Sequence, residues 1–174
     1  MSDDFAPTTK FRTLSGITKG IVRVQIFALT LLGSLWALEI HHNLAWAFFK
    51  EQYLGLFLAL ALGSIFLWVK ARETEREGHV PWYDWLFAAL GLVVGGYVTI
   101  MYPTIAYRLG VLSPDRWLLG GLAIVLILEA TRRLVGWSLV SLAVTFILYA
   151  KFAYLFPGQL YAKGSSWERI ASYL

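Results

Sequence analysis

Three charged residues at the end of an apolar segment are candidates for chemistry: Glu129, Arg132 and Arg133. A helix through this segment places all three on one face, because offsets of three and four residues bring the carboxylate beside either guanidinium. A charged side chain within the membrane costs free energy, so it usually has a structural or functional role. The spacing predicts an ion pair that closes the end of a helix, and it leaves open a contact with a partner subunit or with anionic lipid headgroups. A proton relay is disfavoured, because no second membrane acid lies in line with Glu129.

Histidine could bind metal or haem, but the pattern does not favour it. His41 and His42 are adjacent, so on a helix their side chains point about 100° apart and cannot easily share one ion. The only other histidine, His79, belongs to a charged loop expected on the opposite side of the membrane. The absence of cysteine excludes thiolate sites. We therefore expect no metal and no cofactor.

Enzyme motifs are also missing from the sequence. It contains no phosphate-binding loop, no GxSxG elbow, no HExxH and no acid pair placed for hydrolysis. No corresponding pair of helices is broken by Gly and Pro, the usual indication of a transporter's binding site. Pro103 and Pro157 lie at the ends of apolar runs. We expect a protein that is not an enzyme and that carries no solute unaided.

The composition indicates that transmembrane helices hold the charged residues Glu129, Arg132 and Arg133. Of 174 residues, 58% are hydrophobic and 15% charged, against roughly 45–50% and 25% in soluble domains. A soluble chain this short could not bury so much apolar surface. The net charge of +4 comes without a basic stripe of stacking aromatics, so we expect no nucleic acid as a partner.

Five apolar runs approach or reach the roughly 20 residues that a helix needs to cross a bilayer. They cover about residues 21–38, 54–69, 85–102, 117–130 and 135–156. The sequence therefore predicts an all-α integral membrane protein, a bundle of about five transmembrane helices.

The last two runs are hard to separate, because residues 129–136 between them contain no Pro and one Gly. One interpretation is a tight hairpin of two spans, which we favour. The other is one helix of about 39 residues and nearly 60 Å, which would reduce the count to four and overshoot the bilayer unless strongly tilted.

Two flanking segments complete the predicted organisation. Residues 1–20 form a polar N-terminal segment, with a short interfacial helix expected over residues 9–20. Residues 21–156 form the transmembrane bundle. Residues 157–174 form a C-terminal tail, in which Ser165 and Glu168 have the spacing of a capping box and predict a short interfacial helix.

Basic residues predict the orientation. With five spans and the N-terminus in the cytoplasm, three basic clusters fall inside, as the positive-inside rule requires. The four-span alternative would return the C-terminus to the cytoplasm. The clusters consist of Lys10, Arg12, Lys19 and Arg23, then Lys70, Arg72 and Arg76, then Arg132 and Arg133.

Small residues predict close helix packing. Gly91 and Gly95 form a GxxxG arrangement extended by Gly96, and Ala59 and Gly63 form a similar face in the second run. Such faces let backbones approach in lipid, either within a bundle or against another protein. We assign subunit or lipid contacts to Gly91, Gly95 and Gly96, together with Glu129, Arg132 and Arg133.

The second half of the chain resembles the small membrane component of TRAP transporters, the tripartite ATP-independent periplasmic transporters, in the branch that uses TAXI-type binding proteins. There the small component is often fused in front of the large one. The resemblance covers roughly residues 80–174. It rests on HVPWYDW at 79–85, YP at 102–103, RLG at 108–110, LEATRRLVGW at 128–137, PG at 157–158 and WERIASYL at 167–174.

The resemblance implies a scaffold subunit in the bacterial inner membrane. Its implied partners are a large TRAP membrane subunit, a periplasmic TAXI-type solute-binding protein and membrane lipids, and the implied solute is an organic-acid-like anion. The fused proteins run on where this chain stops, at Leu174, so we expect a separate small subunit. No substrate ligand falls on this chain. The alternative is a membrane anchor of a redox enzyme, which would need haem or quinone.

Overall fold

The computed structural model describes residues 10–39, 49–72, 79–107 and 113–173, and their regular structure is helical apart from one isolated antiparallel bridge. The predicted all-α fold is thereby confirmed. The long helices are α1 (Gly16–Ala37), α3 (Lys50–Trp68), α4 (Trp82–Tyr107), α5 (Pro114–Leu134) and α6 (Trp137–Phe152); the short ones are η1 (Ala153–Leu155), η2 (Gly158–Leu160) and α7 (Trp167–Tyr173).

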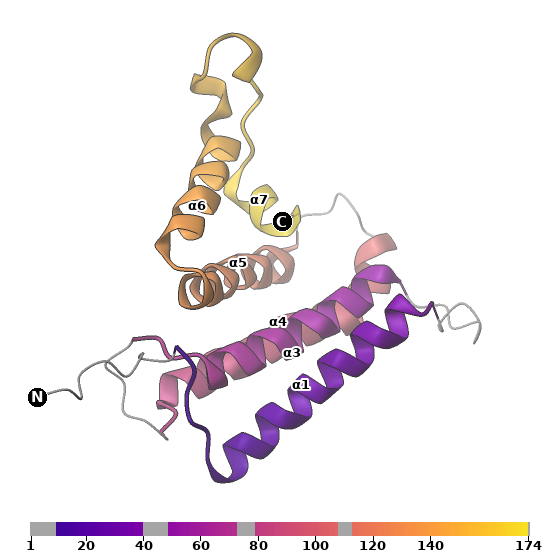
Figure 1. Cartoon of the computed structure of the whole chain (residues 1–174). Coiled ribbons are helices and arrows are strands. Elements are labelled where there is room, and N and C mark those ends of the chain that lie inside the picture. Colours follow the sequence, from indigo (N-terminus) through magenta and orange to yellow (C-terminus); the bar gives the residue numbers. More distant parts are fainter. Residues whose placement is uncertain (1–9, 40–48, 73–78, 108–112, 174) are drawn as a thin grey trace, which may run out of the picture.

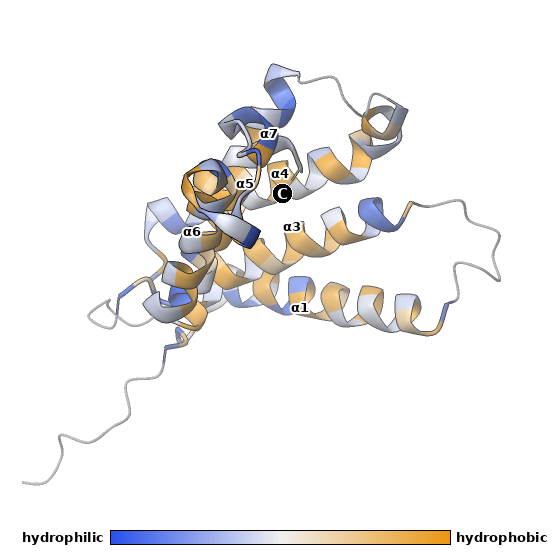
Figure 2. Ribbon diagram, turned by 90° about the horizontal axis from the view of Figure 1, so that it is seen from above, coloured by the Kyte–Doolittle hydropathy of each residue, from blue (hydrophilic) through white to orange (hydrophobic). Residues whose placement is uncertain are grey.

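Four of these helical segments are long and apolar enough to cross a membrane. They are α1, α3, α4 and the continuous stretch Trp137–Leu155, which joins α6 to η1. Hydrophobic residues run along the long helices, while hydrophilic ones gather towards helix ends and in the C-terminal segment (Figure 2). The chain is a multi-pass membrane protein.

Helix α5 corresponds to the fourth apolar run, and it is not among these four segments. Its charged residues Arg116 and Glu129 enclose twelve residues, a length of about 18 Å against a hydrocarbon layer of roughly 30 Å. Any longer stretch of α5 includes at least one charged residue. Four described segments therefore qualify by length and composition alone, and the count of five spans stays a prediction. The last turn of α5 lies beside the first turn of α4, while its first turn contacts Tyr97 farther along α4, so α5 runs back along α4.

The junction of α5 and α6 shows that the single long helix is wrong. Helix α5 ends at Leu134 and α6 begins at Trp137. The N–H groups of Val135 and Gly136 both donate to the carbonyl of Thr131, at 2.9 and 3.3 Å. Gly136 has φ +103°, which residues with a Cβ rarely adopt. This one glycine separates the two helices.

Helices α3 and α4 pack along each other at the centre, with α1 against α3 and α5 against both (Figure 1). Helix α7 lies on α5, and α6 leads away from the other long helices. The buried core joins the first four long helices through Val22, Leu62, Phe66, Leu67, Ala88, Val94, Leu126 and Ala130.

Glycines allow the close approach of α3 and α4. A Cβ at Gly95 would lie 2.5 Å from the carbonyl oxygen of Gly55 and 2.6 Å from the backbone nitrogen of Ala59, and a Cβ at Gly91 would lie 2.7 Å from the Cβ of Leu62. The predicted glycine face is thus filled by α3 of the same chain, which agrees with the bundle interpretation of the motif. At Gly96, in contrast, no atom lies within 4 Å of an added Cβ.

The N-terminal segment differs from the helix expected over residues 9–20. Residues 10–15 are not helical, and Gly16 already begins α1. Phe11 forms an antiparallel bridge with Val69. The Arg12 N–H donates to the Trp68 carbonyl at 2.8 Å, and the Lys70 N–H donates to the Lys10 carbonyl at 3.0 Å. These bonds fix the segment to the end of α3.

At the C-terminus the predicted short helix is present as α7, but the predicted cap is wrong. The Oγ of Ser166 accepts from the Arg169 N–H at 3.3 Å. Ser165 instead donates its N–H to the Ala150 carbonyl at 2.9 Å. The cap is the residue immediately before the first helical one, and α7 begins one residue later than the capping box implies.

Candidate functional site: a buried ion network

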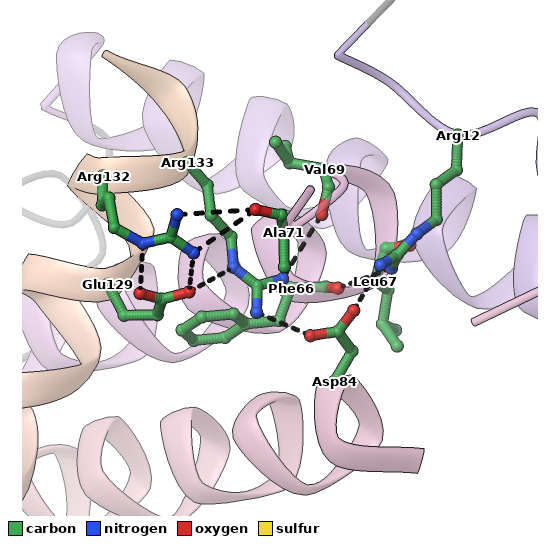
Figure 3. Close-up of polar contacts among 9 residues, drawn as sticks. All are labelled: Arg12, Phe66, Leu67, Val69, Ala71, Asp84, Glu129, Arg132 and Arg133. Atoms are coloured by element: carbon green, nitrogen blue, oxygen red, sulfur yellow. Dashed lines mark hydrogen bonds and ion pairs between the residues drawn. The ribbon is translucent and has the colours of Figure 1, made fainter. Parts of the chain in front are cut away.

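A fully buried carboxylate, Asp84, lies in the first turn of α4. An acid is favourable there because the helix dipole is positive at its N-terminus. Burial of the ionised group is costly unless other charges or donors satisfy it. Asp84 meets this condition through two arginines that come from opposite halves of the chain (Figure 3).

The first partner of Asp84 is Arg133, from the last turn of α5. Its Nη2 donates to Asp84 Oδ1 at 2.7 Å, its Nη1 to the Val69 carbonyl at 3.3 Å and its Nε to Glu129 Oε1 at 2.9 Å. The guanidinium also lies 4.9 Å from the ring centroid of Phe66. Arg133 is buried, and the geometry makes it a bridge between α4 and the end of α3.

The second partner is Arg12, from the N-terminal segment. Its Nη2 donates to Asp84 Oδ2, and its Nη1 donates to the carbonyls of Phe66 and Leu67 at 3.1 and 3.3 Å. These carbonyls belong to the last turn of α3, where a helix leaves its acceptors unpaired. The side chain of Arg12 is buried together with the carboxylate that it binds.

Arg12 thereby completes the C-terminal end of α3. Of the four carbonyls of residues 65–68, three would otherwise lack partners. That of Ile65 accepts from the Val69 N–H at 2.8 Å, those of residues 66 and 67 accept from the Arg12 guanidinium, and that of Trp68 accepts from the Arg12 N–H. Unpaired carbonyls are expensive near lipid, and one residue satisfies three of them.

Glu129 and Arg132 form the more exposed part of the network. Arg132 donates from Nε and Nη2 to the two carboxylate oxygens of Glu129, both at 2.7 Å, and these side chains are each one quarter exposed. Burial raises the pKa of Glu129, but the hydrogen bonds and charges of Arg132 and Arg133 outweigh it and leave the pKa below its ordinary value. The predicted ion pair at the end of this helix is confirmed.

The network gathers basic segments at one end of the bundle. The N-terminal segment, the residues after α3 and the end of α5 all contribute a cation or a carbonyl to it. These segments contain basic residues of the three clusters that the sequence placed on one side of the membrane. The network holds three guanidiniums against two carboxylates, so it combines tight pairing with a net positive charge.

The predicted contact residues fall into different environments. Arg133 is buried, and Gly91 and Gly95 face α3. Glu129, Arg132 and Gly96 retain exposed surface. Only these three have surface left for a subunit or lipid contact, which stays a prediction.

Sequence reasoning missed Asp84 and Arg12 as members of the site. The available signal for Asp84 was an acid between two tryptophans at the start of an apolar run, where charge needs a partner. His41 and His42 lie outside the described residues, and His79 is exposed. No group of three His, Asp or Glu side chains suited to a metal ion occurs in the described ranges.

The arrangement suits a structural joint, because its charged groups are paired with one another and with backbone carbonyls. Comparison of this chain with known protein families, with characterised proteins and with solved structures finds no match.

Proposed function

We propose that this chain is the small, non-catalytic membrane subunit of a TRAP-type transporter of the TAXI branch, in a bacterial inner membrane. In this role it braces a large membrane subunit, which moves an organic-acid-like solute delivered by a periplasmic binding protein. The chain itself binds neither solute nor coupling ion.

The observation that supports this proposal is the meeting of the two segments that carry the resemblance. Asp84 belongs to HVPWYDW and Arg133 to LEATRRLVGW, and the two side chains are joined at 2.7 Å in a buried site. A static brace needs joints of this kind, in which charges hold helix ends together instead of facing a substrate. The residues most specific to the resemblance thus have a structural use.

Helix α6 offers a surface for the proposed partner. As in α1, few residues of the stretch Trp137–Leu155 are buried within the chain, and Leu139, Leu142 and Phe146 are exposed. Helix α6 also leads away from the α1, α3 and α4 bundle (Figure 1). In the proposed complex the large subunit and lipid cover this surface.

The orientation follows from the charges. The network end carries the basic residues of three segments, and Lys and Arg are enriched on the cytoplasmic side of membrane proteins. We therefore infer that the N-terminus, the loop between α3 and α4 and the junction of α5 and α6 are cytoplasmic. This orientation requires α5 to cross the membrane between α4 and α6.

Reconstitution tests the proposed role. Proteoliposomes containing this chain alone, the large subunit alone or both are supplied with the binding protein and a panel of small carboxylates. We expect uptake only where both membrane subunits are present. Uptake by vesicles that contain this chain alone would overturn the proposal, and a haem absorbance band in the purified chain would favour the redox anchor.

A further inference from the structure

A shallow hollow of about 260 Å³ lies at the network end of the molecule, between α1 and the N-terminal segment. Its polar wall contains Lys19 and Arg23 of α1, beside Arg12. Its apolar wall contains Leu14, Val22, Ile26 and Trp68. Arg12 is already engaged by Asp84 and the α3 carbonyls, so Lys19 and Arg23 supply the charge available to a ligand.

The two α1 cations are placed where they destabilise their own helix. They are four residues apart, and like charges at this spacing repel each other. Lys19 also lies near the positive end of the helix dipole, in a helix whose first turn has no acid and no side-chain cap. Both side chains are exposed, and no carboxylate in the described part of the chain pairs with either. An anion between them would relieve both effects.

The surroundings identify the kind of anion. Trp68 is partly exposed at the end of α3, and tryptophan at a helix end favours the headgroup layer. Beside the cations the wall is apolar at Val22 and, one turn further along α1, at Ile26, and α1 continues with the exposed Phe27. The volume is slightly below that of ordinary ligand pockets, and it suits a headgroup and not a whole lipid.

We propose that this hollow binds the headgroup phosphate of an anionic phospholipid through Lys19 and Arg23, with an acyl chain along Ile26 and Phe27. Basic pockets beside membrane helices on the cytoplasmic side bind anionic headgroups in this way. The site belongs to this chain alone, and it does not depend on the transporter assignment.

Lipid titration of the purified full chain in detergent tests the site. The probe is dioctanoyl phosphatidylglycerol, and its binding is followed by melting temperature and by the number of lipids retained in native mass spectrometry. The variant Lys19→Gln/Arg23→Gln should lose affinity about thirtyfold, roughly fivefold for each cation, and should retain one lipid fewer. The control Lys163→Gln/Arg169→Gln removes two exposed cations elsewhere and should bind as the unmodified chain does.

Three results would overturn the site. The first is unchanged phosphatidylglycerol affinity in Lys19→Gln/Arg23→Gln, and the second is an equal loss in the control, which would indicate an effect of overall charge. The third is equal binding of dioctanoyl phosphatidylcholine or of inorganic phosphate, which would remove the anionic lipid as the ligand. Because lipid retention is counted directly, a lower melting temperature of the lipid-free variant does not obscure the outcome.

Discussion

Asp84 is the residue whose loss the fold should tolerate least. It is fully buried, and its two oxygens bind arginines from the N-terminal segment and from α5. A buried charge that loses its partner is far more costly than an exposed one. The same carboxylate thus connects parts of the chain that are distant in sequence.

Replacement of Asp84 by Asn should lower the free energy of unfolding by about 3–5 kcal/mol, because Arg12 and Arg133 would stay buried without a counter-charge. Chemical denaturation in detergent measures the loss. The control Asp115→Asn alters an acid that is also in the first turn of its helix but exposed. Its amide oxygen can still accept the hydrogen bond of the Tyr97 hydroxyl, so the loss should be much smaller. Similar losses for the two variants would show that the network does not hold the fold together.

The lowered pKa of Glu129 predicts a pH dependence of stability. Its contribution is complete above the ordinary carboxyl pKa of about 4.5 and is lost as the pH falls through the lower folded value. The stability difference between the unmodified chain and Glu129→Gln should therefore be constant near neutral pH and shrink in acid below that range. Denaturation series at several pH values test this, and a difference that grows in acid would contradict it.

At the scale of elements, close backbone contact joins α3 to α4, and adjacent glycines allow a matched test. Gly95→Ala would bring a methyl group against backbone atoms of Gly55 and Ala59, and overpacking of this kind costs about 1–3 kcal/mol. Gly96→Ala meets open space and should be neutral or gain up to about 1 kcal/mol from helix propensity. Thermal unfolding of the two variants measures the difference, and equal effects would refute the packing assignment.

The elements also show what the sequence can and cannot predict. The apolar runs predicted the helices, and the GxxxG spacing predicted a close contact, because both depend on local pattern. The apolar centre of α5 is shorter than the hydrocarbon layer, so its place in the bundle depends on its packing against α3 and α4 and not on composition alone. The contact of residues 12, 84 and 133 could not be predicted, because no local pattern relates three segments so far apart in sequence. The sequence shows a glycine at position 136, but it does not predict the positive φ with which Gly136 separates α5 from α6.

At the scale of the whole molecule, the ion pairs of the described residues gather at one end of the bundle. The α1, α3, α4 and α5 bundle has a shared core, whereas α6 touches only α5 and the C-terminal elements, among the contacts described between elements. Buried ion pairs thus hold the helices of the bundle together, and α6 lies beside the bundle without being covered by it. That combination is what the proposed bracing subunit requires.

Affinity purification of the tagged chain at native expression from its own host's membranes tests the central claim most directly. The tagged chain is solubilised in mild detergent, and its complex is analysed by size exclusion and mass spectrometry. We predict a fixed stoichiometric complex with one large multi-span membrane protein that has helices broken by Gly and Pro. Elution of the chain alone, or together with a haem-containing redox enzyme, would contradict the account.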